Sequence, residues 1–379
     1  MSDRLPADPF HYAHRWLAGG HGVALATVAG MSGSSPRPLG SMMVMGSDGR
    51  VEGSVSGGCV EADVIRAGRE IIAGAPPALL RYGGAGAEEW GIRLACGGSL
   101  SVFVEAFRGP ASPQGTFSHA LLEGIIRGMR ERTALTLVRS FDGQHHAVFG
   151  EGEETAGSDP VPSDILAAGR KAGAGKCVRL GGGSEPGWFW QSICPPVRLV
   201  VIGAVHIAQA LTTMGRAMGF ETIVIDPRGD LATPERFRDA SLIADWPDEA
   251  IAALKIDSRT AIVTLTHDSK LDDPALTEAV KSAAFYVGAL GSRRTHAARL
   301  SRLSENGVAK TLLKKIRGPV GLPIGAVGAQ EIAVSILADI VAVRRGAPLA
   351  IRQDWWSPAA GTRTSGETSC AVGAGGELL

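Results

Sequence analysis

The segment RLVVIGAVHIA, residues 198–208, determines how the second half of the chain folds. It begins with an apolar run up to Ile202, turns at Gly203 and continues with apolar residues spaced for one face of a helix. A buried strand that passes into a helix through a glycine opens a strand-helix-strand unit. The segment therefore predicts a parallel sheet flanked by helices.

Three further apolar runs, at 221–225, 260–265 and 285–287, follow this segment, and a closing helix is predicted over 330–344. Strands that are apolar along their whole length are typical of parallel sheets, whose two faces are both covered by helices. We therefore predict an α/β chain in which residues 196–350 form a Rossmann-like, doubly wound parallel sheet.

The residues before this domain have a different character. Short alternating runs at 23–28, 41–45, 100–107 and 134–138 predict strands, and helical spacing predicts helices over 60–73, 117–131 and 162–173. We expect residues 1–195 to form a mixed α/β domain that ends near Pro195. Residues 351–379 contain few large apolar side chains, which favours a disordered tail.

The glycine turn of the second domain carries candidate ligand residues. The helix start beyond Gly203 favours an anion, and His206 stands in its first turn. Asp226 closes the next strand, where a carboxylate can accept a hydrogen bond from a ribose. A dinucleotide-binding turn would have a second glycine in place of Val205, whose branched side chain crowds a pyrophosphate. A purely structural role for the glycine and the aspartate stays open.

Two more turns are expected at the same carboxyl edge of the sheet. His267 and Asp268 follow one strand, and Ser292, Arg293 and Arg294 follow a glycine turn after the next. An imidazole can exchange protons or contact a phosphate, and guanidinium groups at a helix start suit phosphate capture. The alternative is that the two arginines only belong to a solvated helix face.

A glycine-flanked cysteine precedes the first predicted helix of the amino-terminal domain. Gly57, Gly58, Cys59 and Glu61 belong to the motif SGGCVE at 56–61, which places the thiol at the positive end of that helix. A soft thiolate can bind a transition metal such as molybdenum or carry sulfur. The alternative is a cysteine that packs as a small hydrophobic residue.

A second cysteine motif mirrors the first. Cys96 and Gly97 belong to LACGG at 94–98, directly before a predicted strand, and glycines there let the backbone approach a bulky ligand. A loop at 32–40 is rich in hydroxyl groups and contains Ser35 and Arg37, which suit an anionic pocket. This loop can equally be an ordinary turn between strands.

Composition restricts the class of partner. Basic and acidic residues both number 38, so no net charge draws the chain to nucleic acid or to an anionic membrane. The five cysteines have no CxxC spacing, which argues against a disulfide framework or a zinc ribbon. Neither a signal peptide nor a transmembrane segment is predicted, and we expect a cytoplasmic protein.

Taken together and in order, the motifs at 33–40, 56–61, 94–98, 203–208, 266–268, 288–294 and 318–331 resemble the XdhC/CoxI family. The resemblance implies an accessory chaperone, not a catalyst, that binds the molybdenum cofactor as molybdopterin or its cytidine dinucleotide. It further implies delivery to an apo molybdenum hydroxylase of the xanthine or carbon monoxide dehydrogenase type, with a cysteine desulfurase as a second partner. Cys59 and Cys96 would face the metal, and we expect a homodimer.

Two other classes of function compete with this interpretation. An NAD(P)-dependent oxidoreductase fits the strand-turn-helix pattern and Asp226, but Val205 opposes it and a catalytic relay is not evident. A metal-dependent hydrolase would need His206, His267 and Asp268 to meet Asp272 around one ion.

Overall fold

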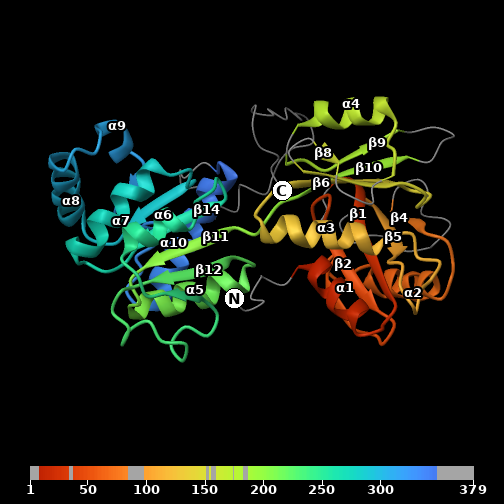
Figure 1. Ribbon diagram of the computed structural model, residues 1–379, viewed down its shortest axis with the longest axis horizontal. Helices are drawn as coiled ribbons and strands as arrows, with labels where there is room; N and C mark the ends of the chain where they lie inside the picture. Colours follow the sequence, from red (N-terminus) through yellow and green to blue (C-terminus); the bar gives the residue numbers. More distant parts are fainter. Residues whose placement is uncertain are drawn as a thin grey trace, which may run out of the picture. The chain divides into compact units, whose positions relative to one another are not determined.

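The computed structural model describes residues 8–33, 37–83, 98–150, 153–154, 159–173, 175–181 and 187–347. These residues form two compact units that divide between Pro195 and Pro196 (Figure 1). The predicted disordered tail lies outside the described residues. No helix in the described ranges has the length and apolar composition needed to cross a membrane.

The carboxy-terminal unit alternates strands and helices. Its elements are β11 (Arg198–Ile202), α5 (His206–Ala217), β12 (Glu221–Ile225), β13 (Ser241–Ile243), α6 (Pro247–Ala253), β14 (Thr260–Thr264), α7 (Ser269–Lys281), β15 (Tyr286–Ala289), α8 (Arg293–Glu305), α9 (Lys310–Leu313), β16 (Ile316–Arg317) and α10 (Ala329–Arg345).

These strands form a six-stranded sheet in the order β13-β12-β11-β14-β15-β16. Every neighbouring pair is parallel. The central strands β11 and β14 are buried at every position, as their unbroken apolar sequences predict. The order is that of a Rossmann fold, in which the chain reverses beside the first strand. The predicted fold class is therefore confirmed.

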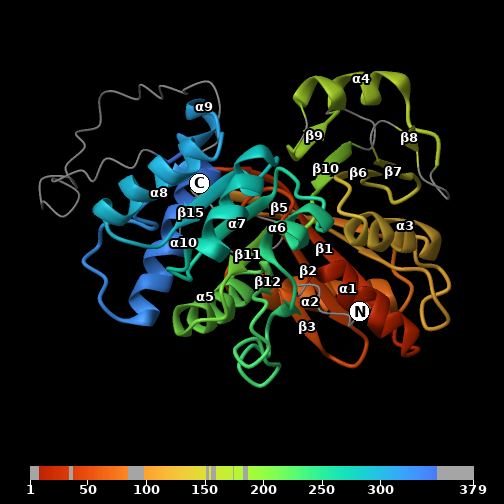
Figure 2. The same ribbon diagram turned by 60° about the vertical axis from the view of Figure 1, so that its left-hand side comes forward.

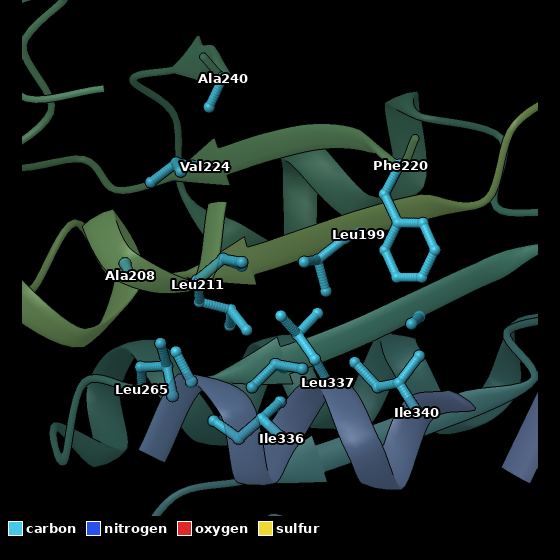
Figure 3. Packing of buried hydrophobic residues seen from close by; sticks show 14 of the residues in the cluster. Leu199, Ala208, Leu211, Phe220, Val224, Ala240, Leu265, Ile336, Leu337 and Ile340 are labelled. Carbon is cyan, nitrogen blue, oxygen red and sulfur yellow. The ribbon is translucent and has the colours of Figure 1, made fainter. Parts of the chain in front are cut away.

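Helices cover both faces of this sheet. On one face, Leu211 of α5 and Ile336 of α10 pack against Leu199 and other strand residues (Figure 3). On the other face, Leu276 of α7 and Leu303 of α8 belong to a second buried cluster, together with residues of α6 and α9. Because successive strand residues alternate between the two clusters, the sheet edge is held rigidly from both sides.

The amino-terminal unit contains two antiparallel sheets and four described helices. Its elements are α1 (Pro9–Ala18), β1 (Val23–Ser32), β2 (Met42–Gly46), β3 (Val51–Gly53), α2 (Glu61–Ile72), β4 (Ala78–Tyr82), β5 (Ser99–Ala106), α3 (His119–Arg130), β6 (Leu135–Ser140), β7 (His146–Gly150), β8 (Glu153–Glu154), α4 (Ser163–Ala172), β9 (Val178–Leu180) and β10 (Trp188–Ile193).

The first sheet has the order β3-β2-β1-β5-β4, and the second has the order β8-β7-β6-β10-β9. Helix α2 covers the outer face of the first sheet, where its apolar side packs on β1 and β5. Phe103 of the first sheet packs against Phe141 and Phe189 between the two sheets. Helix α4 covers the outer face of the second sheet (Figure 2). Ile165 of this helix packs against Trp190.

A buried ionic network joins the inner faces of the two sheets. Arg139 of β6 donates to Glu105 of β5 at 2.7 Å, to Thr27 at 3.2 Å and to Gln191 at 2.6 Å. His146 hydrogen-bonds the second carboxylate oxygen of Glu105. Burial raises the pKa of Glu105, but the charges of its two basic neighbours outweigh burial and lower it to about 2. The carboxylate is therefore a buried anion, and its ion pair with Arg139 connects the two sheets.

Candidate functional site

The glycine turn of the carboxy-terminal unit has no room for a side chain at its first position. Gly203 has φ +104°, a conformation that favours glycine, and a Cβ there would stand 2.5 Å from Cγ2 of Thr266. A hydrogen bond also holds the turn, because Asp226 accepts the backbone N–H of Ala204 at 2.7 Å. Strand β11, helix α5 and the end of β14 are therefore packed around one glycine.

Asp226 is committed to partners within the chain. Its fully buried carboxylate accepts the backbone N–H of Arg228 at 3.0 Å and the guanidinium group of the same residue at 2.7 and 2.8 Å. Burial raises the pKa of Asp226, but the hydrogen bonds from Arg228 and Ala204 outweigh burial and lower it. The structure thus shows Asp226 holding the glycine turn, which differs from the ribose contact that the sequence suggests.

A polar relay connects the turn at Gly203 with the turn after β15. Thr266 donates its hydroxyl to Asp272 at 2.7 Å, and the other carboxylate oxygen lies 3.5 Å from Nη2 of Arg299. The same Nη2 donates to the carbonyl of Leu290 at 2.8 Å. Sequence reasoning missed Arg299, although its place four residues before the buried Leu303 puts it on the buried side of α8.

The predicted polar residues of this edge stand at the starts of helices. His267 is exposed with φ +66°, an uncommon conformation for a residue other than glycine. Asp268 caps α7 by accepting the N–H of Lys270 at 2.9 Å. His206 is exposed in the first turn of α5, and its ring lies 3.3 Å from the amide oxygen of Gln209. These side chains are available to a ligand from solvent.

The metal-hydrolase hypothesis needs these residues to meet around an ion. Asp272 is instead buried and bonded to Thr266, and Asp268 serves as a helix cap. Across the residues that the structure describes, there is no group of three His, Cys, Asp or Glu side chains that could hold a metal ion. The arrangement therefore argues against that hypothesis.

The turn after β15 presents basic side chains at a helix start. Ser292 caps α8 by accepting the backbone N–H of Thr295 at 3.1 Å. Arg293 and Arg294 follow in the first helical turn and are both exposed, without an ion-pair partner among the described residues. Positive side chains add to the positive end of the helix, so this turn is suited to an anion.

In the amino-terminal unit, Glu61 organises the turn that carries Cys59. Its carboxylate accepts the backbone N–H groups of Ser56, Gly57 and Gly58 at 2.8, 3.0 and 2.8 Å. It also accepts the hydroxyl of Ser56. The two glycines have φ of +78° and +119°, which lets consecutive N–H groups point at one carboxylate. Glu61 is thus a positioning residue inside the loop.

The same turn exposes the thiol. Burial raises the pKa of Glu61, but hydrogen bonds from Ser56 and Ser54 outweigh burial and lower it to about 2, so the turn keeps its anion at neutral pH. Cys59 is exposed and its thiol has no hydrogen-bond partner among the described residues. A Cβ at Gly58 would meet no atom of the described residues within 4 Å, so these residues leave open space beside the turn.

Two amino-terminal motifs meet where β1 and β4 end and β5 begins. Ser32 pairs with Ser99 across the strands, and their hydroxyl oxygens are 2.8 Å apart. Gly33 lies against Gly98, since a Cβ on Gly33 would stand 3.2 Å from Cα of Gly98. The loop after β1 and the chain that leads into β5 therefore adjoin at this edge.

The cysteine turn is tied to the same edge. Tyr82 at the end of β4 donates its hydroxyl to Asp63, in the first turn of α2, at 2.7 Å. Arg37 donates from Nε to the carbonyl of Ser54, at 3.3 Å, where the cysteine turn starts. The loop at 32–40 thus contacts both the chain that leads into β5 and the residue that precedes the cysteine motif by two positions. Ser35, Cys96 and Gly97 lie outside the described residues, although Gly98 directly follows the last of them.

Comparisons with known proteins support one family. Residues 199–340 match the XdhC Rossmann domain, and residues 16–83 match the XdhC and CoxI family. The molybdenum cofactor insertion chaperone PaoD of Escherichia coli (strain K12) is 30% identical over 337 residues, which are 88% of this chain and 87% of that protein. A probable xanthine dehydrogenase subunit from Bacillus subtilis (strain 168) is 28% identical over 326 residues, with 85% and 93% covered.

The fold is also shared with a solved structure. A crystal structure of a xanthine dehydrogenase from Bacillus halodurans superimposes with a TM-score of 0.72 over 92% of this chain and 99% of that chain, at 24% identity. Both units of the chain are therefore matched by sequence and by architecture, and the predicted resemblance is confirmed: the chain belongs to the XdhC and CoxI family.

Proposed function

We propose that this chain binds the molybdenum cofactor and delivers it to an apo molybdenum hydroxylase of the xanthine dehydrogenase or carbon monoxide dehydrogenase type. The observation that carries the proposal is the exposed thiol of Cys59 on a preformed turn, in a chain similar over most of its length to a named cofactor insertion chaperone. Its role is that of a carrier and not of a catalyst.

The amino-terminal unit offers a soft ligand to the metal end of the cofactor. A thiolate is a good donor for a soft metal centre, and the open space beside Gly58 leaves room for a bulky group next to Cys59. The motif LACGG at 94–98 supplies Cys96 as a second thiol. We propose both cysteines as metal-facing ligands, with Ser35 and Arg37 in the adjoining loop.

The carboxy-terminal unit offers its sheet edge to an anionic, nucleotide-like part of the ligand. The turn at Gly203, the exposed His206 and His267, and the helix start at Ser292 supply N–H groups, imidazoles and guanidinium groups. This inventory suits a phosphate or pyrophosphate, and we propose molybdopterin or its cytidine dinucleotide as the cofactor form. Asp226 would act through the turn that it closes.

The remaining parts of the proposal concern assembly and location. A cytoplasmic setting is supported by cysteine spacing that fits no disulfide framework and by the free Cys59 and Cys194. We propose a cysteine desulfurase as a second partner because an exposed thiol such as that of Cys59 can carry sulfur. A homodimer is our expectation for the quaternary structure, and light scattering would measure it.

Loading followed by transfer tests the proposed function. The purified protein is mixed anaerobically with cofactor and desalted, and its molybdenum and pterin contents are measured. It is then added to an apo-hydroxylase whose activity is followed. About one cofactor per chain and faster activation than by free cofactor are expected. Desalted protein without molybdenum, or activation no faster than by free cofactor, would overturn the proposal.

A further inference from the structure

Two arginines, one from each sheet of the amino-terminal unit, approach the inner face of the first sheet. Neither belongs to the candidate site described so far. Arg81 of β4 pairs with Ser101 of β5, and Ser101 pairs with Gly30 of β1, so the three form one row across the strands. Arg179 reaches this row from β9 of the second sheet, where its Nη1 lies 3.7 Å from the position of a Cβ on Gly30.

The two guanidinium groups have no acidic partner in the part of the chain that the structure describes. Both side chains are exposed, and neither forms an ion pair there. Arg179 rests instead on the ring of Phe141, 5.1 Å from its centroid, which fixes its direction. Burial and the charge of Arg81 lower the pKa of Arg179. Two like charges thus lie near each other, and no described carboxylate neutralises them.

The strand residues between the two arginines are Ser101 and Gly30, which carry a hydroxyl group and no side chain, respectively. Gly30 lacks a side chain, and a Cβ there would stand 3.2 Å from Cβ and 3.3 Å from Oγ of Ser101, so the glycine lets Ser101 and Arg179 approach strand β1 closely. Two residues further along the strands, the hydroxyl pair of Ser32 and Ser99 continues the same face. Guanidinium and hydroxyl donors gathered on one face of the sheet match the oxygens of a phosphate.

We propose that Arg81, Arg179 and Ser101 form a phosphate site that binds the phosphate of the pterin cofactor. The site lies where β1 and β4 end, the same edge to which the Cys59 turn is tied, but on the opposite face of that sheet. This assignment rests on the proposed function, because it takes the cofactor as the source of the phosphate. It adds a second anchoring point, chemically distinct from the thiols.

Pyrophosphate and complete cofactor serve as separate probes in the test. Binding of each is measured by calorimetry to the wild type, Arg81→Ala, Arg179→Ala, Arg179→Lys and the control Arg127→Ala, which removes an exposed arginine of α3. The two alanine variants at the site should weaken pyrophosphate binding about tenfold or more, and the lysine variant less. The control should bind as the wild type does, and added salt should weaken binding throughout.

The outcomes separate this inference from the proposed function. Loss of pyrophosphate binding in the site variants, together with weaker cofactor binding, supports both. Arginine-dependent pyrophosphate binding in a protein that takes up no cofactor preserves the phosphate site and removes its assignment to the cofactor. Equal pyrophosphate affinity in all variants, or none in the wild type, overturns the site even if the cofactor binds.

Discussion

Gly58 donates its backbone N–H to the carboxylate of Glu61 at 2.8 Å, so the residue before the exposed thiol is fixed by the residue two positions after it. The acid accepts several such donors and folds the loop over itself. The thiol of Cys59 is therefore presented by a preformed turn. A ligand that binds there need not order the loop first, which removes part of the entropic cost of binding.

Replacing the thiol should weaken retention of the molybdenum cofactor without loss of stability. Cys59→Ala removes an exposed side chain that packs against little, so the melting temperature should stay close to that of the wild type. Molybdenum that survives desalting should fall several-fold, as measured by mass spectrometry of the metal. Cys194→Ala, in the same unit, serves as the control and should retain molybdenum. Equal retention by Cys59→Ala would remove this thiol from the site.

Neutralising Glu61 should loosen the turn. Glu61→Gln turns one acceptor into a donor that faces backbone N–H groups, which should cost about 1–3 kcal/mol of unfolding free energy. The amount of molybdenum that survives desalting should also fall, even though Cys59 is still present. Glu52→Gln, at an exposed glutamate of β3, is the matched control for chemical denaturation. A Glu61 variant as stable as this control would show that the turn does not depend on the carboxylate.

The same acid should give stability a defined pH dependence. The pKa of Glu61 falls on folding from 4.5 to about 2, so folding favours the ionised form. Its contribution is complete above the unfolded value and is lost as the pH falls from about 4.5 towards 2. The difference in unfolding free energy between the wild type and Glu61→Gln should shrink over this interval. A difference that stays constant would contradict the assignment.

Removing Arg139 should destabilise the amino-terminal unit strongly. Arg139→Met leaves the buried Glu105 without its guanidinium partner, an arrangement that typically costs about 3–5 kcal/mol. The double variant Arg139→Met with Glu105→Gln removes the uncompensated charge and should recover part of that loss. Urea unfolding of both variants measures the effect. If the double variant is less stable than the single one, Arg139 does not stabilise the unit by compensating the charge of Glu105.

Enlarging Gly203 should strain the glycine turn of the Rossmann unit. Gly203→Ala forces a side chain into a positive-φ conformation and against Thr266, at a cost of about 1–3 kcal/mol. Adding Thr266→Ser removes the contacting methyl group and should relieve the clash but not the backbone strain. Thermal unfolding of the single and double variants separates the two contributions. Wild-type stability in the single variant would rule out the crowded geometry.

Sequence reasoning predicted the Rossmann unit well because its signals are local. Buried parallel strands are apolar throughout, and the glycine at 203 marks the turn between strand and helix. The amino-terminal unit was harder to predict. Residues 188–193, which are not among the strands predicted from the sequence, form strand β10 of a second sheet. Pairing between distant antiparallel strands leaves little trace in a single sequence.

The candidate site shows the same division. The turn of Cys59 was visible because its glycines are adjacent in the sequence. The partners of Asp226 could not be predicted, because nothing in the sequence distinguishes Arg228 from other surface arginines. Only the fold brings its guanidinium group to the carboxylate. The pair of Arg81 and Arg179 comes from two sheets and is separated by nearly a hundred residues. Only the packing of the sheets brings these side chains to one face.

The account is tested most directly by identifying what the protein carries. The wild-type chain is purified anaerobically from cells that make the molybdenum cofactor, and the small molecule released on denaturation is identified by mass spectrometry. We predict molybdopterin or its cytidine dinucleotide, at about one equivalent per chain. Release of NAD or NADP instead, or of no pterin at all, would contradict the central claim.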